Sequence, residues 1–161
     1  MKRKKLTASM IALVMSVSLP MTTYAANWYL EDGSVTVNAD NSGQTVTQGS
    51  TSTPDEAPVI TQRESSVETG NTIAINASDN AAANVTIKDI NIKSSKDAID
   101  VKGSSSANIT LEGDNKIFSE TGSALHVSDG NVTINGSGSL KAEIQDEPFG
   151  YNHNAKIGSH E

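Results

Sequence analysis

The sequence predicts an all-β protein that winds as a parallel β-helix, a solenoid of about three to four coils of 23–26 residues with three short strands per coil. Three observations predict this fold. A phrase of the form Asn-x-Thr-x begins at Asn84, Asn108 and Asn131, so it recurs at nearly equal intervals along the chain. The segments 97–101 and 123–127 are related by a similar interval. Within each of these segments, apolar and polar residues alternate.

The alternation determines the type of secondary structure. Around Asp100, for example, Ile99 and Val101 are apolar, which is the two-residue period of a strand with one buried face. Ile73 precedes Ile99 by the same interval by which Ile99 precedes Leu125. These three residues are therefore expected to stack in one column. Each coil is too thin to bury its own core, and stacking on the next coil supplies the missing contacts.

Two other folds fit the pattern less well. An antiparallel sandwich needs longer strands joined by hairpin turns, and Asn135-Gly136 stands alone as an Asn-Gly signal. A leucine-rich repeat has a similar period, but its Leu-x-x-Leu-x-Leu frame is missing. No segment after residue 26 is typical of a helix, and 52–59, which contains two prolines, is expected to be a loop.

The recurrent Asn-x-Thr is also the acceptor signal for N-glycosylation. Its periodic placement just before a strand favours a structural role, because Asn tolerates turn conformations and bonds nearby backbone groups. Equivalent Asn side chains of stacked coils are expected to hydrogen-bond to one another, and the Thr of each phrase is expected to face outward.

Residues 1–26 are predicted to be a secretory signal peptide. A basic start, MKRKK, precedes an apolar run, and small residues follow up to Ala25 and Ala26. The apolar run of about 14 residues is shorter than the ~20 residues of a membrane-spanning helix. We therefore expect a secreted, extracellular or cell-surface protein, with no membrane insertion once the leader is removed. The absence of cysteine excludes disulfides and a lipid-modified cysteine anchor.

Two regions follow the leader. Residues 27–70 are less regular and are predicted to form a strand-rich N-terminal coil or cap. Trp28 and Tyr29 are expected to cover the open end of the solenoid at this point. Residues 71–161 are predicted to hold the regular β-helix coils.

The C-terminal end departs from the repeat. After 131–144, the segment 145–154 interrupts the period, so the β-helix is expected to be truncated. A last coil without cover is expected to fray or to associate end to end with a second copy. In the alternative arrangement, Phe149 and Tyr151 fold over this end as a cap.

Charge and composition exclude several functions. Four of the twelve basic residues lie at positions 2–5, so the chain after the leader has a net charge of −11 (8 basic − 19 acidic). Nucleic acid and anionic membrane are therefore not expected partners, because phosphate contacts need clustered Lys and Arg. Without cysteine, thiol catalysis and cysteine-based zinc sites are impossible. A Gly-x-Ser-x-Gly elbow, a phosphate-binding loop and a dinucleotide fingerprint are also missing.

The three histidines are not predicted to be catalytic or metal-binding. His126 lies at an outward phase of its strand, and His153 and His160 lie in the irregular tail. None has a partner residue at the local spacing of a metal site, so an exposed structural role is expected for each.

Several phrases of the sequence resemble those of a known family. WYLEDGSVTVNADNSGQTVTQG, NVTIKDINIKSSKDAIDV and NITLEGDNKI, followed by SALHV and GNVTINGSGSL, resemble the right-handed parallel β-helix carbohydrate-binding domain of secreted and cell-surface proteins of anaerobic Gram-positive bacteria. The resemblance covers most of the chain after the leader. It implies a non-catalytic extracellular carbohydrate-binding or adhesion module, with a polysaccharide or glycan of a host, of plant material or of a cell wall as its partner. Family members continue with a Gly-rich turn and further coils, where this chain has NAKIGSHE.

The resemblance also implies bound calcium and, in some members, an acidic polysaccharide ligand. Outward-facing Asp97, Asp100 and Asp129 are the expected calcium ligands, because calcium prefers oxygen donors. An acidic protein repels an acidic glycan, so the ion is expected to bridge the two.

Two alternatives stay open. The first is a polysaccharide lyase-like enzyme, which needs a basic residue beside its calcium-binding carboxylates. Asp114, Lys96 and Lys102 lie near these carboxylates in the sequence, but Arg63 is the only arginine after the leader, so a lyase site is not expected. The second alternative is a structural or incomplete β-helix fragment with no ligand.

Overall fold

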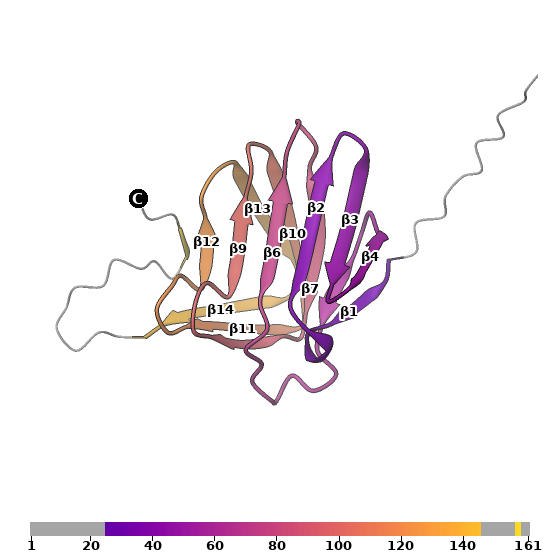
Figure 1. The fold of residues 1–161 in the computed structure, drawn as a ribbon. Helices are drawn as coiled ribbons and strands as arrows, with labels where there is room; N and C mark the ends of the chain where they lie inside the picture. The colour runs from indigo at the N-terminus through magenta and orange to yellow at the C-terminus, as the bar shows by residue number, and fades with distance from the viewer. Residues whose placement is uncertain (1–24, 146–156, 159–161) are drawn as a thin grey trace, which may run out of the picture.

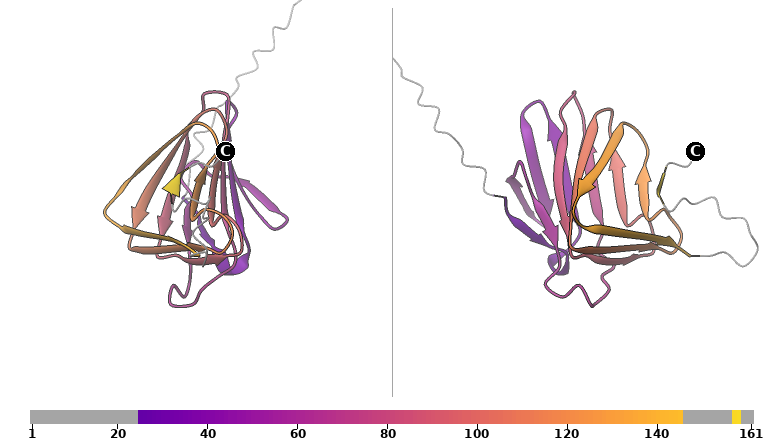
Figure 2. Two further views of the ribbon diagram at one scale, coloured as in Figure 1. Left: turned by 90° about the vertical axis from the view of Figure 1, so that its left-hand side faces the viewer. Right: turned by 180° about the vertical axis from the view of Figure 1, so that it is seen from behind.

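The computed structural model describes residues 25–145 and 157–158. The fold is a parallel β-solenoid of about three turns, as the sequence predicts, with its strands in stacked sheets around one core (Figure 1). Viewed along its axis, the solenoid has a triangular cross-section (Figure 2, left). Residues 1–24 of the predicted leader lie outside the described residues, as do Phe149, Tyr151, His153 and His160.

Three sheets form the sides of the triangle. The first sheet has the strand order β1 (Asn27–Tyr29), β5 (Val59–Thr61), β7 (Ala83–Lys88), β10 (Ser106–Glu112), β13 (Asn131–Gly136). The second has the order β14 (Ser139–Ile144), β11 (Asp114–Ser119), β8 (Asn91–Ser94). The third has the order β15 (Ile157–Gly158), β12 (Leu125–Val127), β9 (Ile99–Lys102), β6 (Ile73–Ala77), β2 (Val35–Asp40), β3 (Gly43–Gln48), β4 (Thr51–Pro54).

Helical structure is confined to one short turn in the described part of the chain. This turn is the 3-10 helix η1 (Leu30–Asp32), which follows β1. Within residues 25–145 and 157–158, no helix has the length and apolar character needed to cross a membrane.

Aliphatic side chains stacked in register hold the coils together. Ile73 pairs with Ile99, and Ile99 pairs with Leu125, which confirms the predicted column. Each of these three residues is at most 1 % exposed. Val35 extends the column on the N-terminal side, where β2 pairs with β6. Burial of one such side chain contributes about 1.5–3 kcal/mol, so the column is a major source of stability.

The coil that begins with β13 stacks in a register that differs from the predicted one. Asn131 pairs with Ser106, and Asn108 pairs with Thr133. The interval between these coils therefore runs from Ser106 to Asn131 and is longer than the predicted interval from Asn108 to Asn131. The predicted equivalence of Asn131 with Asn84 and Asn108 is wrong, although Asn84 and Asn108 do pair.

The same two-residue difference runs through the rest of this coil. Leu140 pairs with Asn115, whereas the interval from Asn108 to Asn131 would have placed Gly138 there. A shift of two residues keeps the same side chains inward, because side chains alternate with a period of two. The observed register places Gly136 opposite Leu111, where an added Cβ would lie 2.2 Å from the Leu111 carbonyl oxygen. A residue without a Cβ is needed at this contact, and its φ of 105° also favours glycine.

Outward asparagine side chains bond along the stack. Asn108 Nδ2 donates to Asn84 Oδ1 at 3.0 Å, which confirms the expected bond between these stacked equivalents. Asn76 Nδ2 donates to Asn38 Oδ1 at 2.8 Å in the same way. Each such bond contributes about 0.5–1.5 kcal/mol, so these ladders support the register that the aliphatic columns set.

The N-terminal region contains antiparallel strands that the sequence did not predict. β2 pairs with β3, and β3 with β4, in antiparallel fashion, while every other pairing among the described strands is parallel. The predicted loop at 52–59 is wrong for residues 52–54, which belong to β4, and for Val59, which begins β5. This antiparallel meander lies at one edge of the third sheet (Figure 1).

Buried polar side chains close the N-terminal end of the core. The indole Nε1–H of Trp28 donates to Asp55 Oδ2 at 2.9 Å, and Trp28 is 8 % exposed. The Gln44 side chain accepts from the Asn84 N–H at 2.8 Å and donates to the Asn84 carbonyl oxygen at 3.0 Å. Asn84 lies just before the residues of β7 that pair with β5, so Gln44 takes the place of a strand partner there.

The last described coil is covered less well than the coils before it. Ile134 in β13 is 39 % exposed, whereas its partner Ile109 in β10 is 1 % exposed. Leu140 and Ile144 in β14 are only partly buried. Because local stability follows buried apolar contacts, β13 and β14 are expected to open more readily than β10 and β11.

Replacing Ile99 by aspartate should unfold the protein or destabilise it by at least about 4 kcal/mol, because an unpaired charge would be buried in the middle of the column. Thermal melting followed by circular dichroism measures the effect. Thr36→Asp is the matched control, since it adds the same charge at an outward position between Thr47 and Ala74. Similar melting temperatures for Ile99→Asp and the unmodified chain would contradict the proposed role of the column.

Hydrogen exchange should be faster in β13 and β14 than in β10 and β11, because the last described coil buries less apolar surface. Exchange followed by mass spectrometry resolves these strands. Equal protection across the four strands would show that the exposure of Ile134 does not reflect local stability.

Candidate functional site

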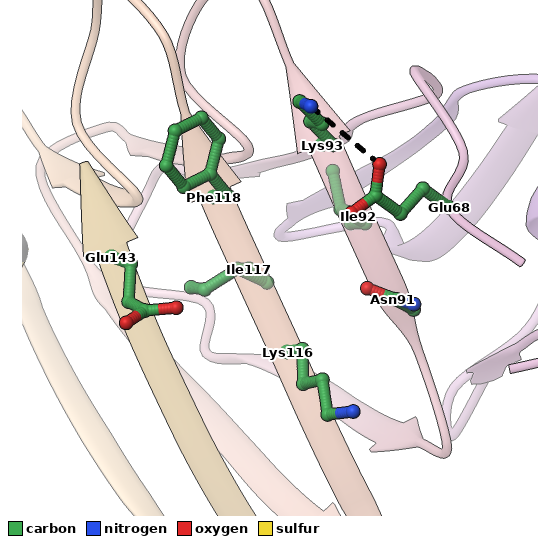
Figure 3. Close-up of a pocket in the computed structure, with 8 residues that line it drawn as sticks. All are labelled: Glu68, Asn91, Ile92, Lys93, Lys116, Ile117, Phe118 and Glu143. Atoms are coloured by element: carbon green, nitrogen blue, oxygen red, sulfur yellow. Dashed lines mark ion pairs between the residues drawn. The ribbon is translucent and has the colours of Figure 1, made fainter. Parts of the chain in front are cut away.

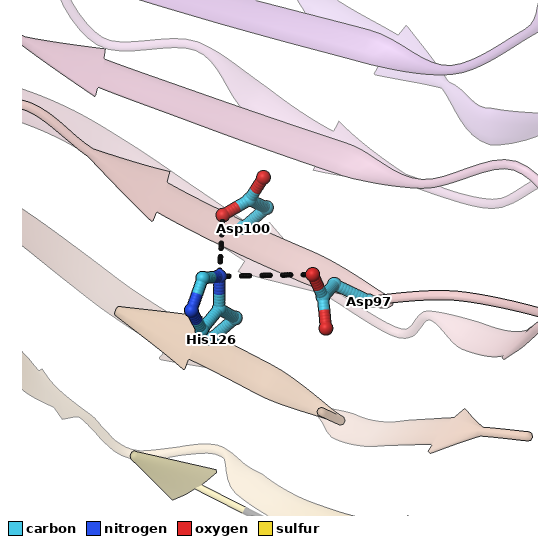
Figure 4. Close-up of side chains that lie close together, drawn as sticks. All are labelled: Asp97, Asp100 and His126. Atoms are coloured by element: carbon cyan, nitrogen blue, oxygen red, sulfur yellow. Dashed lines mark hydrogen bonds and ion pairs between the residues drawn. The ribbon is translucent and has the colours of Figure 1, made fainter. Parts of the chain in front are cut away.

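Two clusters of outward side chains offer binding chemistry on this solenoid. The first, termed the aspartate–histidine cluster, consists of Asp97, Asp100 and His126 (Figure 4). His126 Nδ1 lies 3.0 Å from Asp100 Oδ1 and 3.6 Å from Asp97 Oδ2. One possible ligand atom from each residue lies within 4.8 Å of the others. The register of the solenoid brings them together, because His126 in β12 pairs directly with Asp100 in β9.

A second contact anchors each carboxylate of the cluster. Asp97 Oδ1 accepts a hydrogen bond of 2.6 Å from the backbone N–H of Ser123. Asp100 Oδ2 lies 2.6 Å from Lys102 Nζ, and this hydrogen bond to the carboxylate raises the pKa of Lys102. The other oxygen of each carboxylate is the one close to His126 Nδ1. The side chains of Asp97, Asp100 and His126 are 26 %, 20 % and 11 % exposed, so the cluster is shielded from water but accessible to a small ion.

Serine side chains shape the corner of the coil that presents Asp97. Ser94 and Ser119 pair at the ends of β8 and β11. Ser94 Oγ accepts from the Lys96 N–H at 3.1 Å, and Ser119 Oγ donates to the Lys96 carbonyl oxygen at 2.9 Å. These bonds satisfy backbone groups that leave the sheet at the corner. Gly122 is also required, because a Cβ there would lie 2.5 Å from Asp97 Oδ1.

The structure brings together two of the three aspartates predicted as calcium ligands. Asp97 and Asp100 lie in the cluster. Asp129 is exposed in the turn after β12, where its Oδ1 accepts a hydrogen bond from the Gly130 N–H, and it is not a member of the cluster.

The expectation that His126 is exposed and has no partner residue for a metal site is wrong. His126 is 9 % exposed, because carboxylates from the preceding coil lie against its ring. Asp100 and His126 are a full coil apart in the sequence, outside the spacing of a local metal motif, but a solenoid places residues one coil apart side by side. The predicted pairing of Ile99 with Leu125 already implied that Asp100 lies opposite His126.

The donor set of the cluster differs from the set that calcium prefers. Calcium takes about six to eight oxygen ligands. The cluster offers two carboxylates and an imidazole nitrogen, and the Lys102 ammonium already contacts one of the carboxylate oxygens. Calcium binding by Asp97, Asp100 and Asp129 therefore stays a prediction without support from this arrangement.

The second cluster covers the outer surface of the second sheet and is termed the β8–β11–β14 face. Its outward side chains form two columns, namely Asn91, Lys116, Lys141 and Lys93, Phe118, Glu143. Phe118, one of two phenylalanines in the chain, is only partly buried. A groove of about 210 Å³ on this face is lined by Phe118 together with Lys93 and Lys116 (Figure 3). Lys93 Nζ lies 5.8 Å from the centroid of the Phe118 ring.

Lys116 differs from the other lysines of this face in its charge environment. Lys93 lies 3.7 Å from Glu68, and Lys141 lies 3.0 Å from Glu143. Among the residues described, Lys116 forms no ion pair. It also lines a second hollow of about 400 Å³ next to the groove. Lys116 therefore presents a positive charge between two hollows, where an anionic or hydroxyl group of a ligand can bind.

Sequence reasoning missed Phe118 and Lys116 as binding residues. The alternation around Ile117 predicts that both neighbours face outward, which was the available signal. Their position beside Lys93 depends on the register between β8 and β11, which single strands do not reveal.

A third hollow, of about 470 Å³, lies on the first sheet beside Tyr29 and Arg63. Arg63 makes two hydrogen bonds to the Asp32 carboxylate, at 2.9 and 2.7 Å, and its Cζ lies 4.1 Å from the centroid of the Tyr29 ring. These hydrogen bonds hold the pKa of Asp32 below its usual value. A ligand would have to displace this bidentate pair, so the hollow is a weaker candidate than the β8–β11–β14 face.

Comparison with protein-family models, curated proteins and solved structures gives no match for this chain.

Replacing Gly122 by alanine should destabilise the corner that carries Asp97. The new Cβ would lie 2.5 Å from Asp97 Oδ1 and 2.6 Å from the Asp97 backbone nitrogen, so the backbone must shift. Such overpacking costs about 1–3 kcal/mol, which lowers the melting temperature by at least roughly 4 °C. Gly70→Ala is the control, because the nearest atom to its new Cβ is the Lys93 carbonyl oxygen at 3.9 Å. Equal melting temperatures for the two variants would show that the corner is not closely packed.

Proposed function

We propose that this chain is a non-catalytic extracellular carbohydrate-binding or adhesion module that holds a carboxylate-bearing polysaccharide on its β8–β11–β14 face. The observation that carries the proposal is the partly exposed Phe118 ring, which lines a groove beside Lys116, a cation that forms no ion pair within the described residues. The proposed partner is a glycan of a host, of plant material or of a cell wall.

The side chains of the groove suit a sugar ring. Binding sites combine apolar or aromatic surface with a few placed polar groups. The Phe118 ring offers a flat apolar surface for the apolar side of a sugar, and Asn91 and Lys116 offer hydrogen bonds to its hydroxyl and carboxylate groups.

The shape of the face suits a long ligand better than a small one. β8, β11 and β14 are neighbours in one sheet, of which Figure 1 shows β11 and β14 side by side. Lys116 lines both the groove and the second hollow. An extended polysaccharide can therefore contact several coils, which are about 4.8 Å apart.

The local charge opposes an acidic glycan less than the net charge of the chain does, so direct contact is proposed in place of the calcium bridge. The two hollows are lined by equal numbers of basic and acidic residues, namely Lys93, Lys116, Lys141 and Glu68, Asp114, Glu143, whereas the whole chain has a formal net charge of −7. At physiological salt, charges are screened over about 8 Å, so a carboxylate bound at Lys116 responds to this local balance more than to distant acidic residues.

The extracellular part of the proposal is supported by the first residues of the chain. A basic start, an apolar run and a small-residue end have the pattern of a secretory leader. A polysaccharide ligand outside the cell is consistent with this pattern.

Replacing Lys116 by glutamine should weaken the binding of polygalacturonate by roughly 10- to 100-fold, because a hydrogen bond to a charged group contributes about 1.5–3 kcal/mol. Phe118→Ala should also weaken binding, through loss of the apolar surface. Affinity electrophoresis in gels that contain the polysaccharide, with EDTA present, measures both effects. Lys88→Gln is the matched control, because Lys88 lies on the first sheet and pairs with Glu112.

Four results would count against the proposal. Equal weakening by Lys88→Gln would indicate nonspecific attraction, and complete loss of binding in EDTA would favour a calcium bridge. Formation of unsaturated products from polygalacturonate in the presence of calcium would favour the lyase-like enzyme. Failure to bind any acidic or neutral polysaccharide would favour a structural fragment with no ligand.

A further inference from the structure

We propose that Asp97, Asp100 and His126 form a binding site for a divalent transition-metal ion, with Zn²⁺ as the ion that tests it. The site lies on the third sheet and does not depend on the proposed binding of glycans. The calcium site expected from the sequence has a different ion and has Asp129 as its third ligand. Its expected role is to bridge the protein and a glycan.

The donor set fits a transition metal. An imidazole nitrogen and two carboxylate oxygens are ligands that Zn²⁺ and related ions accept, at about 2.0–2.2 Å. Two such ligands on a tetrahedral ion lie roughly 3.4 Å apart. The distances from His126 Nδ1 to Asp100 Oδ1 and Asp97 Oδ2, at 3.0 and 3.6 Å, lie on either side of this value. Small side-chain movements therefore allow all three residues to contact one ion.

The carboxylates are held in place by a second layer of contacts. The Ser123 N–H holds Asp97 Oδ1, and the Lys102 ammonium holds Asp100 Oδ2, so the oxygen near His126 is the one left for an ion in each case. Such second contacts orient metal ligands and typically change metal affinity by about 10- to 100-fold when removed.

The neighbouring outward position on the N-terminal side does not compete for the Asp100 carboxylate. Asp100 pairs there with Ala74, which has no polar side chain. Water can complete the coordination of the ion, as in sites with three protein ligands.

The charges of the cluster also favour a divalent cation. Two carboxylates lie beside the imidazole, and Lys102 is the one cation within 4.0 Å of them in the described part of the chain. An ion with two positive charges balances both carboxylates. In the ion-bound state, His126 would coordinate through Nδ1 as a neutral imidazole.

A bound ion would connect two adjacent coils. Asp97 and Asp100 come from the coil of β9, and His126 comes from the next coil along the chain. The neighbouring coil interface is otherwise held by strand pairing and by the column through Leu125. We therefore expect the ion to raise the stability of β12 as well as of the whole chain.

The test is calorimetric titration of the full chain with ZnCl₂, using protein purified without a polyhistidine tag. The expected result is one ion per chain and a higher melting temperature in excess Zn²⁺. His126→Ala and Asp100→Asn should each lower the affinity for Zn²⁺ by more than about 100-fold. This loss exceeds the one expected from removing a residue that only orients a metal ligand. Replacing Zn²⁺ by Co²⁺ should give visible absorption that His126→Ala removes.

Two control variants distinguish this site from other metal-binding residues. The double variant His153→Ala/His160→Ala and the variant Asp129→Asn should keep the unmodified affinity, and circular dichroism should show that every variant is folded. No Zn²⁺ binding by the unmodified chain would overturn the proposal. Binding that persists in folded His126→Ala, or that is lost in the double variant, would also overturn it.

Discussion

The structure depends on one constraint, which is that successive coils stack in parallel with the same side chains facing inward. A single coil cannot bury its own apolar residues, so Ile99 is stable only between Ile73 and Leu125. Each buried aliphatic side chain contributes about 1.5–3 kcal/mol, whereas one exposed hydrogen bond contributes less. The aliphatic columns therefore set the register, and polar ladders such as Asn84 with Asn108 follow it.

The same register determines the surface. When inward residues stack, outward residues one coil apart are brought side by side, whatever their separation in the sequence. Asp100 and His126 meet because Ile99 and Leu125 pair, and Phe118 lies beside Lys93 because Ile117 pairs with Ile92. A solenoid therefore forms binding sites as a consequence of core packing, from residues that are a full coil apart in the sequence and that no short local motif reveals.

The charged side chains of the described surface differ in whether they already form ion pairs within the protein. Arg63 is engaged by Asp32 and by the Tyr29 ring, which leaves little capacity for a ligand. Lys116 forms no ion pair with any described residue, and it lies beside an aromatic ring. Exposed ion pairs contribute little to stability, so a ligand can engage Lys116 at little cost to the fold. This contrast is why the β8–β11–β14 face is favoured as the glycan site.

The sequence by itself determined the fold class, the two-residue alternation and the column through Ile99, because these follow from local periodicity and from a repeat interval that can be counted. Only the tertiary structure decided the register of the last coil. A shift of two residues leaves the same side chains inward, and the close backbone contact at Gly136 selects between the two registers. Contacts between distant residues likewise gave Gln44 its place at the N-terminal end and gave His126 its two carboxylate neighbours. These features depend on packing between coils, which the periodicity of one strand does not encode.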